Sequence, residues 1–237
     1  MNPFEFISLF RRALGERAGL PLAFWYSDSP LAANGKIQGC MFRVFADVLE
    51  GASVSLSLDN IGCGGGKLYA GFAPMGEHIP NFVSNNEHYK DSPEAVVGFI
   101  HALRIEMAGK RYLNITRVDK LASFDGVEGV VFFATPDVLS GLCSWAFYDN
   151  HSSDAVTSAF GSGCSAVFTQ AVNENRANGR RCFLGLFDPS ARVHFGADIL
   201  SFAVPMSRFR EMCATLPHTC LIEQSPAWDK IRTRING

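Results

Sequence analysis

Ser53-Val54-Ser55-Leu56-Ser57-Leu58 is the stretch that decides the fold, because serine and an aliphatic residue alternate along it without a break. Side chains of a β-strand point to opposite faces of a sheet in turn, so a period of two predicts a strand buried on one side. We expect Val54, Leu56 and Leu58 on the buried face and the serines on the other. A glycine-rich segment follows this strand directly.

Helices and strands are predicted on both sides of this strand. Apolar residues recur at the helical period over residues 4–14, and further helices are expected over residues 40–49 and from Pro205 or Met206 to Thr215. A small polar residue followed by proline predicts three more helix starts, at Ser92-Pro93, Thr135-Pro136 and Ser225-Pro226. Runs of β-branched and aromatic residues predict strands over residues 22–26, 112–118, 129–134, 182–187 and 202–204.

This order of elements sets the fold class. Because strands and helices are interspersed, we expect an α/β or α+β fold in which helices cover the sheet. No linker rich in Pro, Gly or Ser divides the chain, so residues 1–237 are expected to form a single mixed domain.

Composition argues against several classes of protein. Hydrophobic residues make up 47% of the 237 residues and charged residues 19%, which is enough for a core without metal or disulfide support. A formal net charge of −2 argues against nucleic acid or an anionic membrane as partner. No signal peptide and no run of ~20 apolar residues is evident. Seven cysteines without compact spacing fit free thiols in a reducing compartment, so we expect a cytoplasmic protein.

The first segment with chemical potential is Gly62-Cys63-Gly64-Gly65-Gly66-Lys67. Such glycines allow positive φ angles, and their successive N–H groups could form a nest for an anion. The phosphate-binding loop of nucleoside triphosphatases is excluded. Ile61 stands where that loop has its first glycine, and Leu68 stands where it needs Ser or Thr. Two interpretations remain: a tight turn with a buried thiol, or a ligand site at Cys63.

The second such segment is Gly161-Ser162-Gly163-Cys164-Ser165-Ala166, which precedes an apolar stretch and predicts the start of a helix. In the first turn, the helix dipole would lower the pKa of the Cys164 thiol. The segment also matches Gly-x-Gly-x-x-Ala, with Asp188 as a distant acidic partner, as in dinucleotide-binding units. We rank that interpretation low, because residues 154–160 make a poor buried strand.

The histidines and the other cysteines show no local metal motif. No histidine pair has zinc-like spacing, and no Cys-x-x-Cys occurs. Cys143, Cys182 and Cys213 fall within apolar segments and are expected in the core. His88 lies in the polar stretch 84–90, which predicts a surface loop. Alternatively, this loop folds back over the glycine turn and presents His88 or Tyr89 to a ligand.

Several motifs together resemble the domain-of-unknown-function 169 family, which is found in archaea and bacteria. The resemblance covers most of the chain and implies no established activity, but it draws attention to Cys40, Cys63 and His88. A departure occurs at residues 184–187, where relatives have a Gly-Cys pair after the strand. The motifs that carry the resemblance are Pro21-Leu22-Ala23-Phe24, Gly39-Cys40, the segment 59–66, Glu87-His88-Tyr89-Lys90, the segment 161–167 and Phe202-Ala203-Val204-Pro205.

Three functional hypotheses follow from these segments. The first is a domain that binds a small molecule, a cofactor or an anion in a cleft between the two glycine loops, with Gly62, Cys63, Gly64, Gly65, Gly66, Gly161, Gly163, Cys164, His88 and Tyr89 as the candidate ligand contacts. The second is a thiol-dependent enzyme in which Cys63 or Cys164 is the nucleophile and His88 the base. The third is a metal or iron–sulfur protein with Cys40, Cys63 and Cys164 as ligands. The sequence leaves the oligomeric state and any cofactor open.

Overall fold

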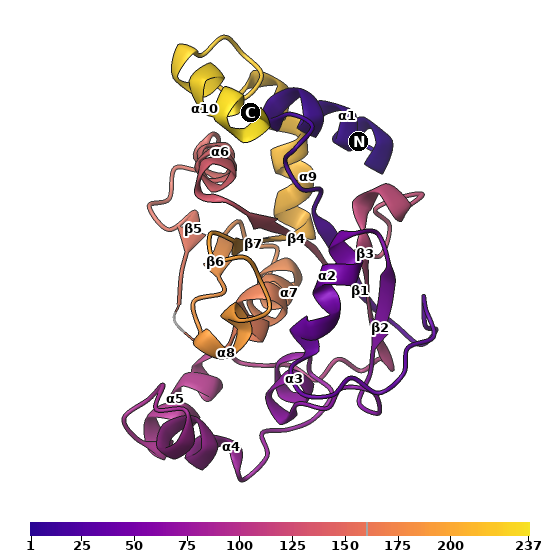
Figure 1. The fold of residues 1–237 in the computed structure, drawn as a ribbon, viewed down its shortest axis with the longest axis vertical. Helices are drawn as coiled ribbons and strands as arrows, with labels where there is room; N and C mark the ends of the chain where they lie inside the picture. The colour runs from indigo at the N-terminus through magenta and orange to yellow at the C-terminus, as the bar shows by residue number, and fades with distance from the viewer. Residues whose placement is uncertain (160) are drawn as a thin grey trace.

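A seven-stranded sheet forms the centre of the computed structural model, which describes residues 1–159 and 161–237 (Figure 1). Its strand order is β2-β3-β1-β4-β7-β6-β5, so β1 lies between two strands that come much later in the chain. All neighbouring strands are antiparallel except β5 and β6, which are parallel. The strands are β1 Leu22–Ser27, β2 Ser53–Leu56, β3 Tyr112–Arg117, β4 Gly129–Ala134, β5 Val156–Thr157, β6 Cys182–Gly185 and β7 Leu200–Pro205.

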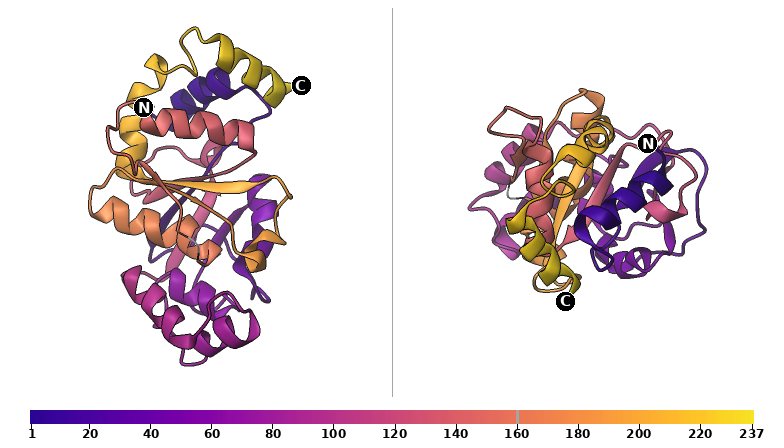
Figure 2. Two further views of the ribbon diagram at one scale, coloured as in Figure 1. Left: turned by 90° about the vertical axis from the view of Figure 1, so that its left-hand side faces the viewer. Right: turned by 90° about the horizontal axis from the view of Figure 1, so that it is seen from above.

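The central strand β4 is buried along its whole length, because helices cover both faces of the sheet. Val131 and Phe133 point into one hydrophobic core, whereas Val130 and Phe132 point into the other. This is the alternation that the pleat of a strand requires. The fold therefore has three layers, with the sheet between two layers of helices (Figure 2). The α/β class expected from the sequence is confirmed.

One face of the sheet, which we call the α1 face, is covered by the two chain ends and by two internal helices. Phe6, Phe10 and Phe209 pack here with Trp145 in a fully buried aromatic group. The two ends meet at this side, where Arg17 donates to the Gly237 carbonyl at 2.8 Å. The helices of this face are α1 Pro3–Leu14, α6 Pro136–Phe147, α9 Met206–Thr215 and α10 Pro226–Asn236.

The opposite face, the α7 face, is covered by shorter helices that lead to the candidate site. Phe168 packs edge-on against Phe24 of β1 and Phe45 of α2, which ties this layer to the sheet. The elements of this face are a 3₁₀ helix Met41–Val44, α2 Phe45–Leu49, α3 Gly64–Tyr69, a π-helical turn Ser165–Thr169, α7 Gln170–Arg176 and α8 Pro189–Arg192.

A helical segment inserted between α3 and β3 lies at the end of the molecule opposite to the termini (Figure 1). It contains α4 Ile79–Asn81, a π-helical turn Phe82–Asn86 and α5 Pro93–Ala102, and we call it the α4–α5 segment. Its two ends join at Gly71, whose carbonyl accepts from the Ala108 N–H at 2.8 Å. Gly71 has a φ of 72°, and a Cβ there would lie 2.6 Å from the Glu106 carbonyl oxygen, so only glycine fits this crossing.

Most element predictions are confirmed, including helix starts at Pro93, Pro136 and Pro226. The strand expected over residues 53–58 is shorter than predicted, because β2 stops at Leu56. Leu58, which was expected on the buried face, is 46% exposed. Ser55 is buried rather than outward-facing. Its hydroxyl accepts from the Leu31 N–H at 2.8 Å and contacts Asn114 at 2.6 Å. The loop that follows β1 therefore covers this side of β2.

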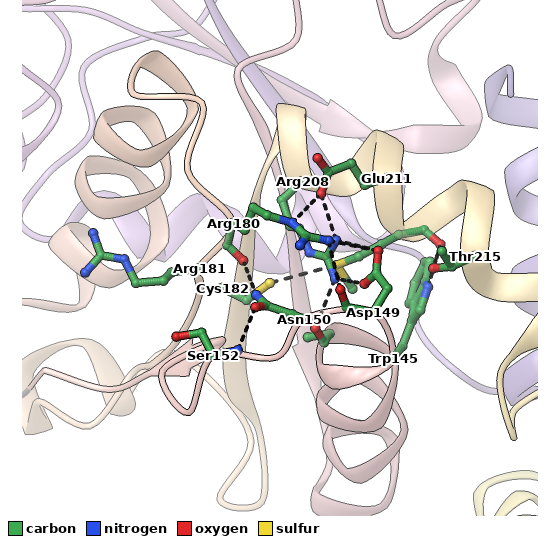
Figure 3. A network of polar contacts seen from close by, with 12 residues as sticks. Trp145, Asp149, Asn150, Ser152, Arg180, Arg181, Cys182, Arg208, Glu211 and Thr215 are labelled. Carbon is green, nitrogen blue, oxygen red and sulfur yellow. Dashed lines mark hydrogen bonds and ion pairs between the residues drawn. The ribbon is translucent and has the colours of Figure 1, made fainter.

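A polar network joins α6, α9 and the loop before β6 (Figure 3). The Arg208 side chain is 0% exposed, and its guanidinium donates to Asp149, to Glu211 and to the Ala146 carbonyl. Arg180 binds the same two carboxylates at 2.9 and 2.8 Å. Two cations thus share two anions around one buried side chain.

Among the residues that the structure describes, no helix is long and apolar enough to cross a membrane.

Candidate functional site

A cavity of about 440 Å³ lies between the α7 face and the α4–α5 segment. We call it the Cys63 cavity. Aromatic and aliphatic side chains form much of its wall, and the starts of α3, of the π-helical turn Ser165–Thr169 and of α8 meet at it. It is lined by Gly39, Cys40, Phe42, Cys63, Gly64, Gly65, Gly66, Tyr69, His78, Ile79, Phe82, Val83, Glu87, Tyr89, Lys90, Val96, Phe99, Gly161, Ser162, Gly163, Cys164, Asp188, Ser190 and Ala191.

The first glycine segment is the opening turn of α3 and not a nest. None of the glycines in residues 62–66 has a positive φ, which corrects the expectation of an anion-binding loop. Cys63 is the N-cap of α3, and its sulfur accepts from the Gly66 N–H at 3.4 Å. A Cβ at Gly66 would lie 3.0 Å from Ile61, so the turn packs tightly. Gly65 has space on its cavity side.

The second glycine segment packs against the α4–α5 segment and α8. At Gly161 a Cβ would clash with the Phe99 ring, and at Gly163 it would lie 2.7 Å from the Ala191 side chain. Cys164 lies in the first helical turn, as the sequence predicts. Both glycine segments therefore reach the same cavity, with Cys63 on one and Cys164 on the other.

Asp188 links this second segment to α8. Only 3% of the residue is exposed, and one carboxylate oxygen accepts from the Ala191 N–H at 2.7 Å and the Ser190 hydroxyl at 2.9 Å. The other oxygen accepts from the Gly163 N–H. The Asp188 carboxylate thus accepts from the Gly163 N–H, a group that a helix start would otherwise offer to an anion. An anionic ligand, one of the candidates from the sequence, is disfavoured here.

Two of the cavity thiols hold their protons more tightly than usual. Burial raises the pKa of Cys40 to about 11, and negative charge on Cys63 and Asp188 contributes. Burial also raises the pKa of Cys164 well above its ordinary value, and charge on Cys40, Cys63 and Asp188 adds to this. The expected lowering by the helix dipole is therefore wrong for Cys164, because loss of water outweighs the dipole.

We expect Cys164 to react slowly with iodoacetamide in the folded protein, since alkylation requires the thiolate. Its rate at pH 7 should be at least about tenfold lower than that of the exposed Cys220, and should still be rising above pH 9. Mass spectrometry of timed, acid-quenched samples gives both rates, with urea-unfolded protein as control. If Cys164 reacts as fast as Cys220 at pH 7, it is an activated thiol after all.

Other acidic groups at the cavity shift in the same direction. Burial raises the pKa of Tyr69, and negative charge on Cys164 and Asp188 adds to it. Burial also raises the pKa of Glu87, and the negative charge on Asp188 raises it further. Besides burial, the acidic groups around Asp188 therefore oppose one another's ionisation.

His88 and Gly62 are the predicted site residues that the structure places outside the cavity lining. His88 is exposed, with a φ of 55°, and it is absent from the cavity lining, whereas its neighbours Glu87 and Tyr89 line the cavity. The histidine in the lining is His78, and a Cβ on Gly64 would lie 3.3 Å from its Nε2. His88 is thus not positioned as a base for Cys63 or Cys164. The expected loop at residues 84–90 begins with the end of a π-helical turn.

Sequence reasoning missed His78, Tyr69 and Glu87, and it gave Asp188 a different role. One signal was available: Asp188 precedes Pro189, the same pattern of capping residue and proline that marks other helix starts. Nothing in the local sequence distinguishes His78, which borders the cavity, from His88, which does not, and both residues are exposed. Their difference arises from how the α4–α5 segment folds onto the sheet.

The arrangement of β5, α7 and β6 is a parallel βαβ unit, as the Gly-x-Gly-x-x-Ala match implies. Dinucleotide binding is nevertheless disfavoured. β5 has only two residues, and the Gly163 N–H that would meet a pyrophosphate is taken by Asp188. The sequence indicated a poor buried strand over residues 154–160, of which β5 takes only Val156–Thr157, and position 160 lies outside the described residues.

The third hypothesis needs Cys40, Cys63 and Cys164 to converge as ligands. All three line the Cys63 cavity. Within residues 1–159 and 161–237, however, no group of three His, Cys, Asp or Glu side chains has the arrangement that holds a metal ion. Cys182 and Cys213 are buried in the core, and Cys143 is partly buried.

Comparison with known proteins supports the resemblance seen in the sequence. The model of the family DUF169, described as uncharacterised ArCR, matches residues 19–215. The chain belongs to the domain-of-unknown-function 169 family. No curated protein and no solved structure matches it. The matched region of this family member spans the whole sheet and every residue of the cavity lining.

Proposed function

We propose that this protein binds a small organic molecule, neutral or positively charged and mostly apolar, in the Cys63 cavity. The observation that carries the proposal is one cavity onto which both glycine segments and three thiols open. Its volume of about 440 Å³ lies in the range of ligand pockets. Phe42, Ile79 and Phe82 supply apolar contacts, and few polar groups fix the ligand's orientation.

The charge of the ligand follows from the acids around the cavity. Asp188 already receives three hydrogen bonds, and its charge raises the pKa of Glu87. The lining holds two carboxyl groups, Glu87 and Asp188, and one lysine, Lys90, so an anionic ligand would meet more negative than positive charge. The raised pKa of Cys164 also weighs against that residue as the nucleophile of a thiol-dependent enzyme, because burial keeps its thiol protonated.

Nile red, a neutral apolar dye, tests the proposal. Titration should give one saturable site with blue-shifted emission, and Gly65→Leu should weaken binding at least tenfold. A leucine here starts from ordinary contacts of 3.7 Å to Cys63 and 3.8 Å to Tyr69, so it fills the cavity without a clash at Cβ. Gly98→Leu is the matched control, since Gly98 lies on a helix with nothing within 4 Å of its Cβ position.

The charge preference is tested with anilinonaphthalene sulfonate, an anionic dye. It should bind at least tenfold more weakly than Nile red to the same protein. Equal Nile red binding by wild type and Gly65→Leu would show that the dye does not occupy the Cys63 cavity and would contradict the proposal. Tighter binding of the anionic dye would contradict only the charge assignment.

A further inference from the structure

Two cysteines of the cavity follow chain segments that are paired with each other. Ile37 and Ile61 form an isolated parallel bridge, and the Ile37 N–H donates to the Asn60 carbonyl at 2.8 Å. Gly62 crosses so close to this partner that a Cβ would clash with the Ile37 carbonyl oxygen and lie 3.2 Å from the Gly39 nitrogen. Cys40 and Cys63 are the residues that follow Gly39 and Gly62.

Their thiols also share one environment. Both side chains are partly buried, and both line the Cys63 cavity. Negative charge on Cys63 raises the pKa of Cys40, so the two sulfurs lie within each other's electrostatic field.

We propose that Cys40 and Cys63 are a reversible oxidation site that closes to a disulfide when a peroxide enters the cavity. The Cys63 sulfur attacks one peroxide oxygen, the O–O bond breaks, and a sulfenic acid and water form. The Cys40 sulfur then attacks the sulfenic sulfur and releases a second water. The peroxide is reduced, two thiols are oxidised, and a dithiol reductant reverses the reaction.

Cys40 suits the role of second thiol better than Cys164 does. Cys164 is 6% exposed and sits within a continuous helical stretch, so its backbone cannot move toward Cys63 without breaking helical hydrogen bonds. Cys40 lies outside regular structure, between Gly39, which has a φ of 71°, and the 3₁₀ helix. A disulfide requires Cα atoms about 4.4–6.8 Å apart, and any movement toward that distance would come from this segment, which precedes the 3₁₀ helix.

Peptide mapping tests the site on the full-length folded protein. Protein is treated with a small excess of hydrogen peroxide, its remaining thiols are alkylated in denaturant, and it is digested with trypsin without reduction. Arg43 lies between the two cysteines, so residues 37–43 and 44–67 become separate peptides. We expect these two peptides to be linked, two fewer free thiols per chain, and full reversal by dithiothreitol.

Cys40→Ser and Cys63→Ser should each abolish the linked peptide, whereas Cys220→Ser should retain it. Cys220 is the matched control because its thiol is exposed and lies away from the cavity lining. A link from Cys63 to Cys164, or free Cys40 and Cys63 after peroxide treatment of the wild type, would overturn the proposal. This outcome is independent of Nile red binding, so the two proposals can fail separately.

Discussion

Asp149→Ala is expected to lower the free energy of unfolding by roughly 3 kcal/mol, because it leaves the buried Arg208 guanidinium without its bidentate partner. Arg208 would keep Glu211 at 2.8 Å and the Ala146 carbonyl at 3.0 Å, but Glu211 is 47% exposed and screened by water. Arg180 would lose a partner at the same time. Urea denaturation followed by circular dichroism measures the change.

The matched control is Asp137→Ala, which breaks another bidentate Asp–Arg pair. Its partner Arg234 is 66% exposed, so this loss should be at most about 1 kcal/mol. Equal losses for Asp137→Ala and Asp149→Ala would contradict the importance we give to the burial of Arg208. Arg208→Met should cost less than Asp149→Ala, since the two carboxylates keep Arg180 and no buried charge remains.

The same network sets an acid dependence. The hydrogen bond from Arg208 holds the pKa of Asp149 below its ordinary value. A carboxyl whose pKa is lowered on folding stabilises the protein above its unfolded value, near 4, and this contribution is lost as the pH falls through the folded value. The stability difference between wild type and Asp149→Asn should therefore shrink when denaturation is repeated below about pH 4.

Asp188→Ala is the second change with a large expected effect. It removes the acceptor for the buried N–H groups of Gly163 and Ala191 and for the Ser190 hydroxyl, so we expect a loss of about 2–4 kcal/mol. The starts of α7 and α8 would separate, and Nile red binding should fall with stability. Chemical denaturation and dye titration of one sample measure both.

Ser225→Ala is the control for an ordinary helix cap, because the Ser225 hydroxyl accepts only the Trp228 N–H, at 3.3 Å. Its cost should be about 1 kcal/mol. If Asp188→Ala costs no more than this, Asp188 caps α8 and does not hold the cavity together. Asp188→Asn removes the charge but replaces one accepting oxygen with an NH₂ group, so it should bind the anionic dye more tightly than wild type at some cost in stability.

Local sequence rules predicted those parts of the fold that depend on neighbouring residues. Ser92 and Ser225 cap helices because each hydroxyl reaches an N–H three residues ahead, and the run of β-branched and aromatic residues over 129–134 predicts β4. The family resemblance is confirmed by the match to residues 19–215. Both cysteines chosen from their glycine neighbours line the cavity.

Contacts between distant segments decided the rest. The buried Ser55 hydroxyl donates to Asn114, which comes 59 residues later in the chain. Arg208 likewise donates to Asp149, from which it is separated by 59 residues. Cys164 follows the rule for a helix start, yet burial against the α4–α5 segment and α8 reverses its expected pKa shift. His78 lines the cavity and His88 does not, although both residues are exposed, because the fold of the α4–α5 segment decides which of them borders the cavity.

The position of β1 has a consequence for synthesis on the ribosome. β1 pairs only with β3 and β4, and Asn114 of β3 follows Ser27 of β1 by 87 residues. At about 5–20 residues per second, β1 waits roughly 4–17 s before its first neighbour exists. During that time Phe24, Trp25 and Tyr26 lie on a strand with two unpaired edges. Protection of this nascent strand, more than final stability, should therefore limit the yield of folded protein.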